Sequence, residues 1–237
     1  MRIKVLFNKE ALHADLRTGW GVSFLIDDKI LFDTGENGEW LLENMRLLKV
    51  DRDAIEAVVI SHDHWDHWGG LWDLLERRKG MRVHICPGFG RGFKDKAGRL
   101  GAELVASEGP ASIAPGVFTT GEVRGAYRAL SIAEQAAALK TENGVSVLTG
   151  CAHPGVVAMV ERAREHLAGE PLYLVGGGFH LMSSTRPSIE KVAGRFREMG
   201  VRKAGPTHCS GDAAEEVFRK AYGRDFVSLK VAEVLEV

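Results

Sequence analysis

Short apolar runs alternate with amphipathic segments along the whole chain. The run Ala57–Ile60 is apolar at every position, which is typical of a strand buried on both faces. Comparable runs predict strands over Ile3–Phe7, Val22–Ile26, Lys29–Phe32, Ala57–Ile60, Arg82–Cys86, Val117–Thr119, Val145–Leu148, Leu172–Val175, Lys203–Gly205 and Val227–Leu235. Segments with apolar residues three and four positions apart predict helices over Glu39–Lys49, Leu71–Lys79, Gly155–Leu167, Ser188–Met199 and Asp212–Tyr222.

The interleaving of these strands and helices favours the α/β class. We predict a four-layer αββα sandwich, in which two packed mixed sheets carry helices on their outer faces, and a single domain over residues 1–237. One segment, Gly88–Gly101, is rich in glycine and carries four basic side chains. We interpret it either as a mobile flap that recognises an anionic substrate or as an ordinary solvated loop.

Charge and composition restrict the classes of function. The 31 basic residues nearly cancel the 32 acidic ones, so no overall field attracts nucleic acid or an anionic membrane. No apolar stretch approaches the ~18 residues that span a bilayer, and the N-terminus resembles a strand rather than a signal peptide. Three cysteines are too few for a disulfide framework. We expect a cytoplasmic protein that acts on a small-molecule substrate, for which an anionic molecule is a candidate. We expect no nucleic-acid or membrane partner.

The residues best suited to metal binding or catalysis follow the strand Ala57–Ile60. His62, His64, Asp66 and His67 fall within six positions, and imidazole and carboxylate ligands suit zinc, iron or manganese. A tight loop after the strand can fold all four around one centre. The competing interpretation is a polar loop whose histidines face solvent, and the rarity of histidine argues against it.

Three later histidines occupy similar positions. His153, His180 and His208 each follow a predicted strand and precede a helix, at the sheet edge where ligands gather in α/β proteins. Asp33, at the end of Lys29–Phe32, is placed to hydrogen-bond the far nitrogen of a ligating imidazole, although a plain turn aspartate is the alternative.

These motifs, in this order, resemble the metallo-β-lactamase superfamily. The resemblance is carried by Asp33-Thr34-Gly35, by the His-x-His-x-Asp-His run from His62 to His67, by Gly150-Cys151-Ala152-His153, and by His208. The segments Gly177–Leu181 and Pro206–Gly211 resemble, more narrowly, a subgroup named dihydropterin-ribofuranosyl-aminobenzene phosphate synthase.

The resemblance implies two divalent metal ions, with zinc expected and manganese or iron as alternatives. The first ion would be bound by His62, His64 and His153, and the second by Asp66, His67 and His208. Hydrolases of this superfamily usually also have a bridging aspartate, but Leu174–Leu181 contains no acidic residue. Either His180 is a ligand, or a hydroxide alone bridges the ions, or the second site is weak. We expect His180 to contact metal or substrate.

The implied activity is that of a binuclear metal-dependent hydrolase acting on a small ester, lactone or phosphate-containing molecule. Metal binding lowers the pKa of water toward ~7 and so supplies a hydroxide nucleophile. Asp66 would orient the nucleophile or pass a proton to the leaving group, and His180 would act as a general acid or oxyanion donor. Two other classes stay open: a pterin-pathway synthase, which is a transferase of methanopterin-type cofactor assembly, and a non-catalytic metal-binding protein.

Several neighbouring residues have two interpretations. Cys151 and Cys209 adjoin the histidine motifs and could be thiolate ligands, but we favour small buried thiols that only pack. Trp65 and Trp68 either line a substrate pocket or pack beneath the metal-binding loop.

Overall fold

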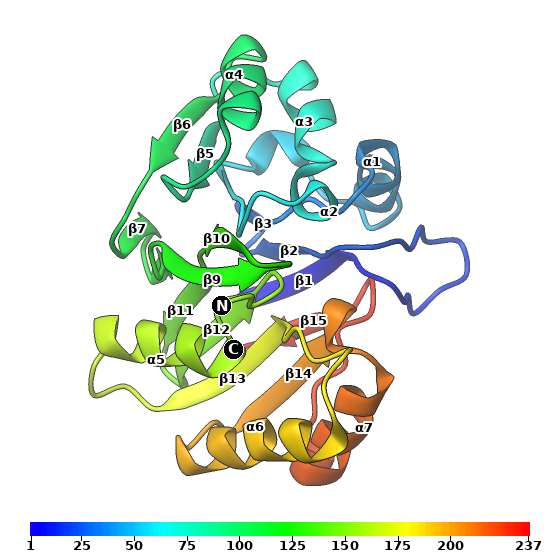
Figure 1. Ribbon diagram of the computed structural model, residues 1–237. Coiled ribbons are helices and arrows are strands. Elements are labelled where there is room, and N and C mark those ends of the chain that lie inside the picture. Colours follow the sequence, from blue (N-terminus) through cyan, green and yellow to red (C-terminus); the bar gives the residue numbers. More distant parts are fainter.

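The computed structural model describes residues 1–237 as four layers, with two β-sheets face to face and helices on both outer sides (Figure 1). The first sheet has seven strands in the order β15 (Val234–Glu236), β1 (Arg2–Phe7), β2 (Ser23–Ile26), β3 (Ile30–Phe32), β4 (Ala57–Val59), β5 (Arg82–Ile85) and β6 (Glu103–Ala106). Strands β3 to β6 are parallel, and the others pair antiparallel.

The second sheet has six strands in the order β14 (Lys203–Thr207), β13 (Leu172–Gly178), β12 (Gly144–Thr149), β11 (Ala137–Thr141), β8 (Val117–Thr119) and β7 (Ala111–Ala114). Strands β12, β13 and β14 are parallel. A separate hairpin, formed by β9 (Val123–Tyr127) and β10 (Leu130–Glu134), lies in front of the two sheets in Figure 1.

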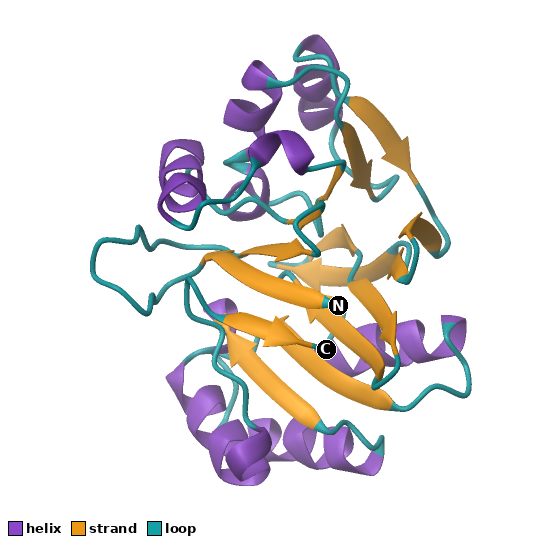
Figure 2. Cartoon of the chain, turned by 180° about the vertical axis from the view of Figure 1, so that it is seen from behind, coloured by secondary structure: helices purple, strands orange, loops and turns teal.

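Three apolar cores hold the layers together. Between the sheets, Phe24 and Phe32 pack with Leu139 and Leu148. The helices α1 (Gly38–Leu47), α2 (Trp65–Trp68), α3 (Leu71–Arg77) and α4 (Arg91–Arg99) lie on the side of the first sheet, and α5 (Val156–His166), α6 (Arg186–Glu198) and α7 (Asp212–Tyr222) cover the second, as both views show (Figures 1 and 2). The predicted αββα sandwich with two mixed sheets is therefore confirmed. No helix is both long and apolar enough to cross a membrane.

Some predicted boundaries were wrong. The expected strand Val227–Leu235 is mostly irregular, and only its end forms β15. The helix expected over Ser188–Met199 begins two residues earlier, because α6 starts at Arg186 after Thr185 and takes Pro187 into its first turn. Five strands were not predicted, because their side chains are mostly half-exposed or small and so give no long apolar run. These are β6, β7, β9, β10 and β11.

The basic segment Gly88–Gly101 is neither a flap nor a solvated loop. It contains the helix α4, whose Phe93 and Ala97 are buried against the first sheet while its basic side chains face outward. Phe93 packs edge-on against Phe89 and Trp68, which fixes the segment to the core.

The parallel strands of both sheets end at the same edge of the sandwich. Loops leave this edge after β3, β4, β12, β13 and β14, and these are the loops that carry Asp33, the Ser61–His67 run and the three later histidines. The fold thus gathers residues from 33 to 208 at one place.

Candidate metal centre

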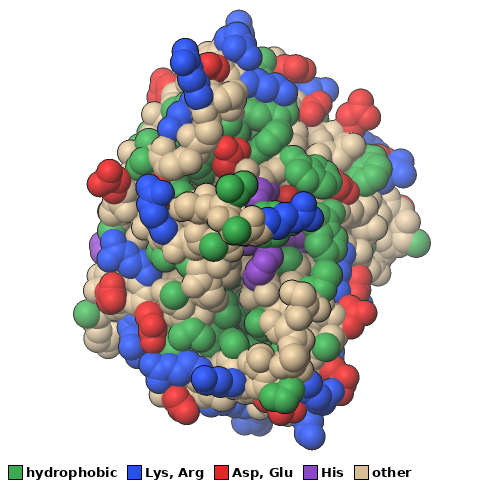
Figure 3. Space-filling model, in the orientation of Figure 1, with side chains coloured by type: hydrophobic (Ala, Val, Ile, Leu, Met, Phe, Trp, Pro, Cys, Tyr) green, Lys and Arg blue, Asp and Glu red, His purple; other side chains and the backbone are tan.

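A pocket of about 500 Å³ opens at this edge, and several potential metal ligands line it. Its lining includes His64, Asp66, Cys151, His153 and His208. In the space-filling view, histidine side chains are visible in a hollow near the middle of the face, with basic and hydrophobic side chains around it (Figure 3). The volume is in the range of pockets for small molecules.

The first group of potential ligands consists of His62, His64 and His153, whose ligand atoms lie within 4.8 Å of one another. His62 Nε2 is 3.0 Å from His64 Nδ1. The ring of His153 lies 4.8 Å from that of His62 and 4.9 Å from that of His64, measured between centroids. The sequence run and the Gly-Cys-Ala-His motif therefore meet in space.

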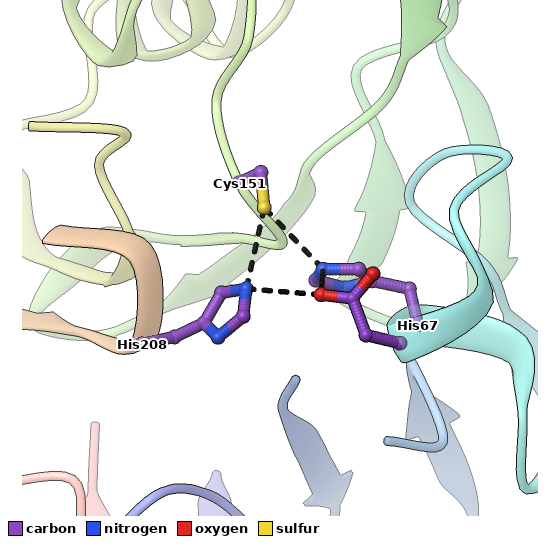
Figure 4. A group of neighbouring side chains, drawn as sticks. His67, Cys151 and His208 are labelled. Carbon is purple, nitrogen blue, oxygen red and sulfur yellow. Dashed lines mark hydrogen bonds and ion pairs between the residues drawn. The ribbon is translucent and has the colours of Figure 1, made fainter. Parts of the chain in front are cut away.

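The second group contains Asp66, His67 and His208, and Cys151 joins them (Figure 4). Asp66 Oδ2 is 3.3 Å from His67 Nε2 and 3.4 Å from His208 Nε2. Cys151 Sγ is 3.4 Å from His67 Nε2 and 3.3 Å from His208 Nε2. Ligands around one tetrahedral ion such as zinc are separated by roughly 3.3–3.6 Å, and the four distances above lie in this range.

Cys151 also lies near the first group. Its Sγ, a ring nitrogen of His153 and one of His180 are within 4.8 Å of one another. The thiol therefore stands between the two groups, in contrast to the packing role that we expected for it. His180 lines the pocket with its ring 4.4 Å from that of His153, but it is not grouped with His62 and His64.

One position in the segment Leu174–Leu181, which contains no acidic residue, is closed to any side chain. A Cβ atom at Gly178, the last residue of β13, would lie 2.1 Å from Gly150 O and 2.8 Å from Cys209 Sγ. A carboxylate side chain at this strand end is therefore excluded.

Asp33 supports the second group through a contact with His67. Its Oδ2 is 2.7 Å from His67 Nδ1, so His67 directs its other nitrogen, Nε2, toward Asp66 and Cys151. Ser61 donates to the same carboxylate through its backbone N–H and its hydroxyl, both at 2.7 Å. The carboxylate thereby fixes the ring orientation of His67.

Glu134 is a buried carboxylate that sequence reasoning missed. Lying at the end of β10, it accepts hydrogen bonds from the backbone N–H groups of Cys151, Ala152 and His153 at 2.7 to 2.9 Å. Burial raises the pKa of Glu134 to about 7, although these three N–H groups oppose the shift. Glu134 therefore shapes the loop that presents Cys151 and His153.

We expect Glu134→Ala to lower the free energy of unfolding by about 3 kcal/mol, because three buried N–H groups would lose their acceptor. Glu134→Gln should have a smaller effect, since one amide oxygen can still accept. Urea unfolding measures both, and Glu142→Ala in an exposed turn is the control. Equal stability of Glu134→Ala and Glu142→Ala would show that the loop does not depend on this carboxylate.

Backbone strain is concentrated at the site. Asp33, Ala152, His180 and His208 have φ between 52° and 61°, a left-handed region that non-glycine residues rarely adopt. Such residues cost about 1 kcal/mol or more each and persist where the surroundings fix them. All four lie in the loops that build the metal centre.

The chemistry of the donor set fits divalent cations. Burial lowers the pKa of His62 well below its usual value, and burial with the nearby His180 and His64 lowers that of His153 to about 3. These rings are therefore neutral near pH 7, which is the form that binds metal. Both ring nitrogens of His153 and the Nδ1 of His180 are buried without a hydrogen-bond partner. A cation would satisfy such orphaned nitrogens.

The sequence model of the family described as "Metallo-beta-lactamase superfamily" matches residues 21–157, which is more than half of the chain. The chain belongs to the metallo-β-lactamase superfamily. A 7,8-dihydropterin-6-methyl-4-(beta-D-ribofuranosyl)-aminobenzene-5'-phosphate synthase of Methanocaldococcus jannaschii is 29% identical to it, over 91% of this chain and 89% of the relative.

Solved structures agree with this membership of the metallo-β-lactamase superfamily. Tm1679, described as a metal-dependent hydrolase of the beta-lactamase superfamily, is 28% identical, covers 100% of this chain and 99% of its own, and gives a TM-score of 0.84. YhfI from Bacillus subtilis covers 100% and 98% with a TM-score of 0.71, and at 14% identity it supports the fold alone.

The structure brings together every site residue that the sequence suggested. His62, His64, Asp66, His67, His153 and His208 lie in the two groups, Asp33 lies behind His67, and His180 lies at the pocket wall. Trp65 lines the pocket, whereas Trp68 packs against Trp72. Glu134, Tyr127 and Arg128 were missed, because each lies in the unpredicted hairpin.

Proposed function

We propose that this superfamily member is a binuclear metal-dependent hydrolase of a small ester, lactone or phosphate-containing substrate. The observation that carries the proposal is the presence of two adjoining groups of ligand atoms at the base of one pocket. A single structural metal would need neither the second group nor the opening to solvent.

The residues have distinct roles in this proposal. His62, His64 and His153 would hold one divalent cation, and Asp66, His67, His208 and the Cys151 thiolate would hold the other. When bound, zinc or manganese ions activate water and polarise the bond to be cleaved. Asp33 positions His67 through its 2.7 Å contact with Nδ1.

Two side chains are placed to act on the substrate. Asp66 lines the pocket, and one of its oxygens can orient water while the other faces the histidines. His180 lines the wall beside His153, where an imidazole can donate a hydrogen bond to charge that develops on the substrate. Interaction with Cys209, against the effect of burial, raises the pKa of His180, which favours its donor form.

A transferase is the second candidate, and the Methanocaldococcus jannaschii synthase favours it, since that relative covers most of the chain. The two candidates differ in the acceptor. A hydrolase transfers the cleaved group to water, whereas a pterin synthase joins two organic substrates. Mass spectrometry of products from a pterin diphosphate and an aminobenzene riboside phosphate would identify the conjugate if the transferase assignment is right.

We expect the purified protein to contain about two equivalents of divalent metal, and chelation to remove hydrolysis of aryl esters or phosphodiesters. Zinc or manganese should restore the activity, and elemental analysis should show both equivalents returning with it. The proposal of a metal-dependent hydrolase would be overturned if protein with less than roughly 0.1 equivalent of metal kept its full turnover.

A further inference from the structure

The hairpin of β9 and β10 contributes to the wall of the pocket, where the ring of Tyr127 packs against the histidines. The ring of Tyr127 lies 4.8 Å from that of His64, 5.1 Å from that of His153 and 6.0 Å from that of His180, between centroids. Tyr127 and the next residue, Arg128, both line the pocket. The turn of the hairpin is therefore set directly above the metal-ligating side chains.

The turn itself is unusual. Tyr127 pairs with Leu130, so Arg128 and Ala129 form a two-residue turn, with φ of 48° and 65°. Both residues in the left-handed region are characteristic of a type I′ turn, which strongly prefers Asn-Gly. This chain places an arginine and an alanine there, at a conformational cost. Strain of this kind at a pocket rim indicates a side chain that is kept for binding.

The guanidinium group of Arg128 is free. It makes no ion pair and no hydrogen bond, and its one close partner is the Tyr127 ring, 5.2 Å from Cζ to the centroid. Among the residues that line the pocket, Arg128 is the only lysine or arginine. By contrast Arg124, on the same hairpin, is paired with Glu122 at 2.7 Å.

The rest of the rim is apolar and aromatic. Trp20, Trp65 and Met182 line the pocket with exposed fractions of 37%, 55% and 56%, and they are three of only seven large hydrophobic side chains exposed on the whole surface. Leu130, which is 74% exposed, follows on the hairpin. Such a concentration of exposed apolar area indicates a binding surface.

We propose that the β9–β10 hairpin is a substrate-recognition element, in which the Arg128 guanidinium binds an anionic group of the substrate while Trp20, Trp65 and Met182 hold a flat apolar portion. The substrate class is an organic anion with an aromatic or similarly flat body, whose reactive bond faces the histidines. This takes the pocket of the proposed function as the substrate site, and it assigns the anion to Arg128 rather than to α4.

The test uses binding, so that it does not depend on turnover. The probe is naphthalene-1-sulfonate, a flat anion that coordinates metals weakly, and its neutral partner is naphthalene-1-methanol. Both are titrated into the metal-loaded protein by calorimetry and by tryptophan fluorescence. Arg128→Gln is compared with the parent, with Arg128→Lys, and with Arg91→Gln on α4, where Arg91 is exposed and lies outside the pocket.

We expect Arg128→Gln to weaken sulfonate binding by about 10-fold and leave the neutral probe within about 2-fold, because the loss is that of one charge-assisted contact. Arg128→Lys should recover part of the affinity, and Arg91→Gln should not change it. Equal sulfonate affinity of the parent and Arg128→Gln would overturn the proposal, as would an equal loss for both probes. If hydrolysis is never found but the sulfonate loss is selective, the hydrolase assignment fails while the anion site stands.

Discussion

Replacement of His64 by alanine should reduce turnover by at least about 10³-fold, because a lost ligand removes several kcal/mol of charge stabilisation from the transition state. One of the two metal equivalents should be lost as well, since His64 would leave its cation with only His62 and His153. The fold should persist. His64 is only partly buried, and although it precedes α2 its side chain makes no capping hydrogen bond. Elemental analysis and thermal unfolding check the two parts separately.

His180→Asn is the matched control for this experiment. His180 lies within 4.8 Å of Cys151 and His153 but belongs to neither of the two ligand sets proposed above, so this variant should keep both metal equivalents while its kcat falls by about 10²-fold. A His64→Ala protein with unchanged metal content would contradict the ligand assignment. Loss of metal from His180→Asn would instead make His180 a ligand.

The sequence was sufficient for the elements whose burial is uniform. Ala57–Ile60 is apolar at every position because β4 lies inside the first sheet between parallel neighbours, and its residues are all buried. The histidines could be predicted for a related reason. Each follows a strand end, and parallel strands bring their carboxyl ends to one edge, so positions from 62 to 208 converge without any knowledge of the loops.

The rest of the site depends on tertiary contacts that leave no local pattern. Glu134 resembles any glutamate at the end of a weak strand, yet the fold buries it beneath the Gly150–His153 loop. The hairpin that carries Arg128 lacks the Asn-Gly turn by which such hairpins are recognised. The basic character of α4 suggested anion binding, but only the folded chain shows that Arg128, and not α4, lies at the pocket.

For Cys151 the sequence favoured a packing role, whereas the structure groups its thiol with potential metal ligands. A buried thiol without a charged partner is inert, and burial raises the pKa of Cys151 well above its usual value. A thiolate at this position is therefore stable only with a cation beside it. The four distances of 3.3 to 3.4 Å that connect Cys151 Sγ and Asp66 Oδ2 to the nitrogens of His67 and His208 describe the space for that cation.

We therefore expect the cobalt-substituted protein to have a near-ultraviolet absorption band from charge transfer between thiolate and Co(II), and Cys151→Ser to abolish it. The same variant should bind its second metal at least about 100-fold more weakly, which exceeds the usual loss when only a hydrogen-bond partner of a ligand is removed. Absorption spectroscopy during titration with cobalt measures both, and neither depends on a substrate.

Cys209→Ser is the matched control, because Cys209 is also buried and its Sγ lies 3.5 Å from the carbonyl oxygen of Cys151, but it belongs to neither ligand group. This variant should keep the band and the metal affinity. A band that survives Cys151→Ser and disappears in Cys209→Ser would move the thiolate ligand to the loop of His208. Absence of the band in the parent protein would contradict the thiolate assignment. Asp66, His67 and His208 would then be the only protein ligands of the second site.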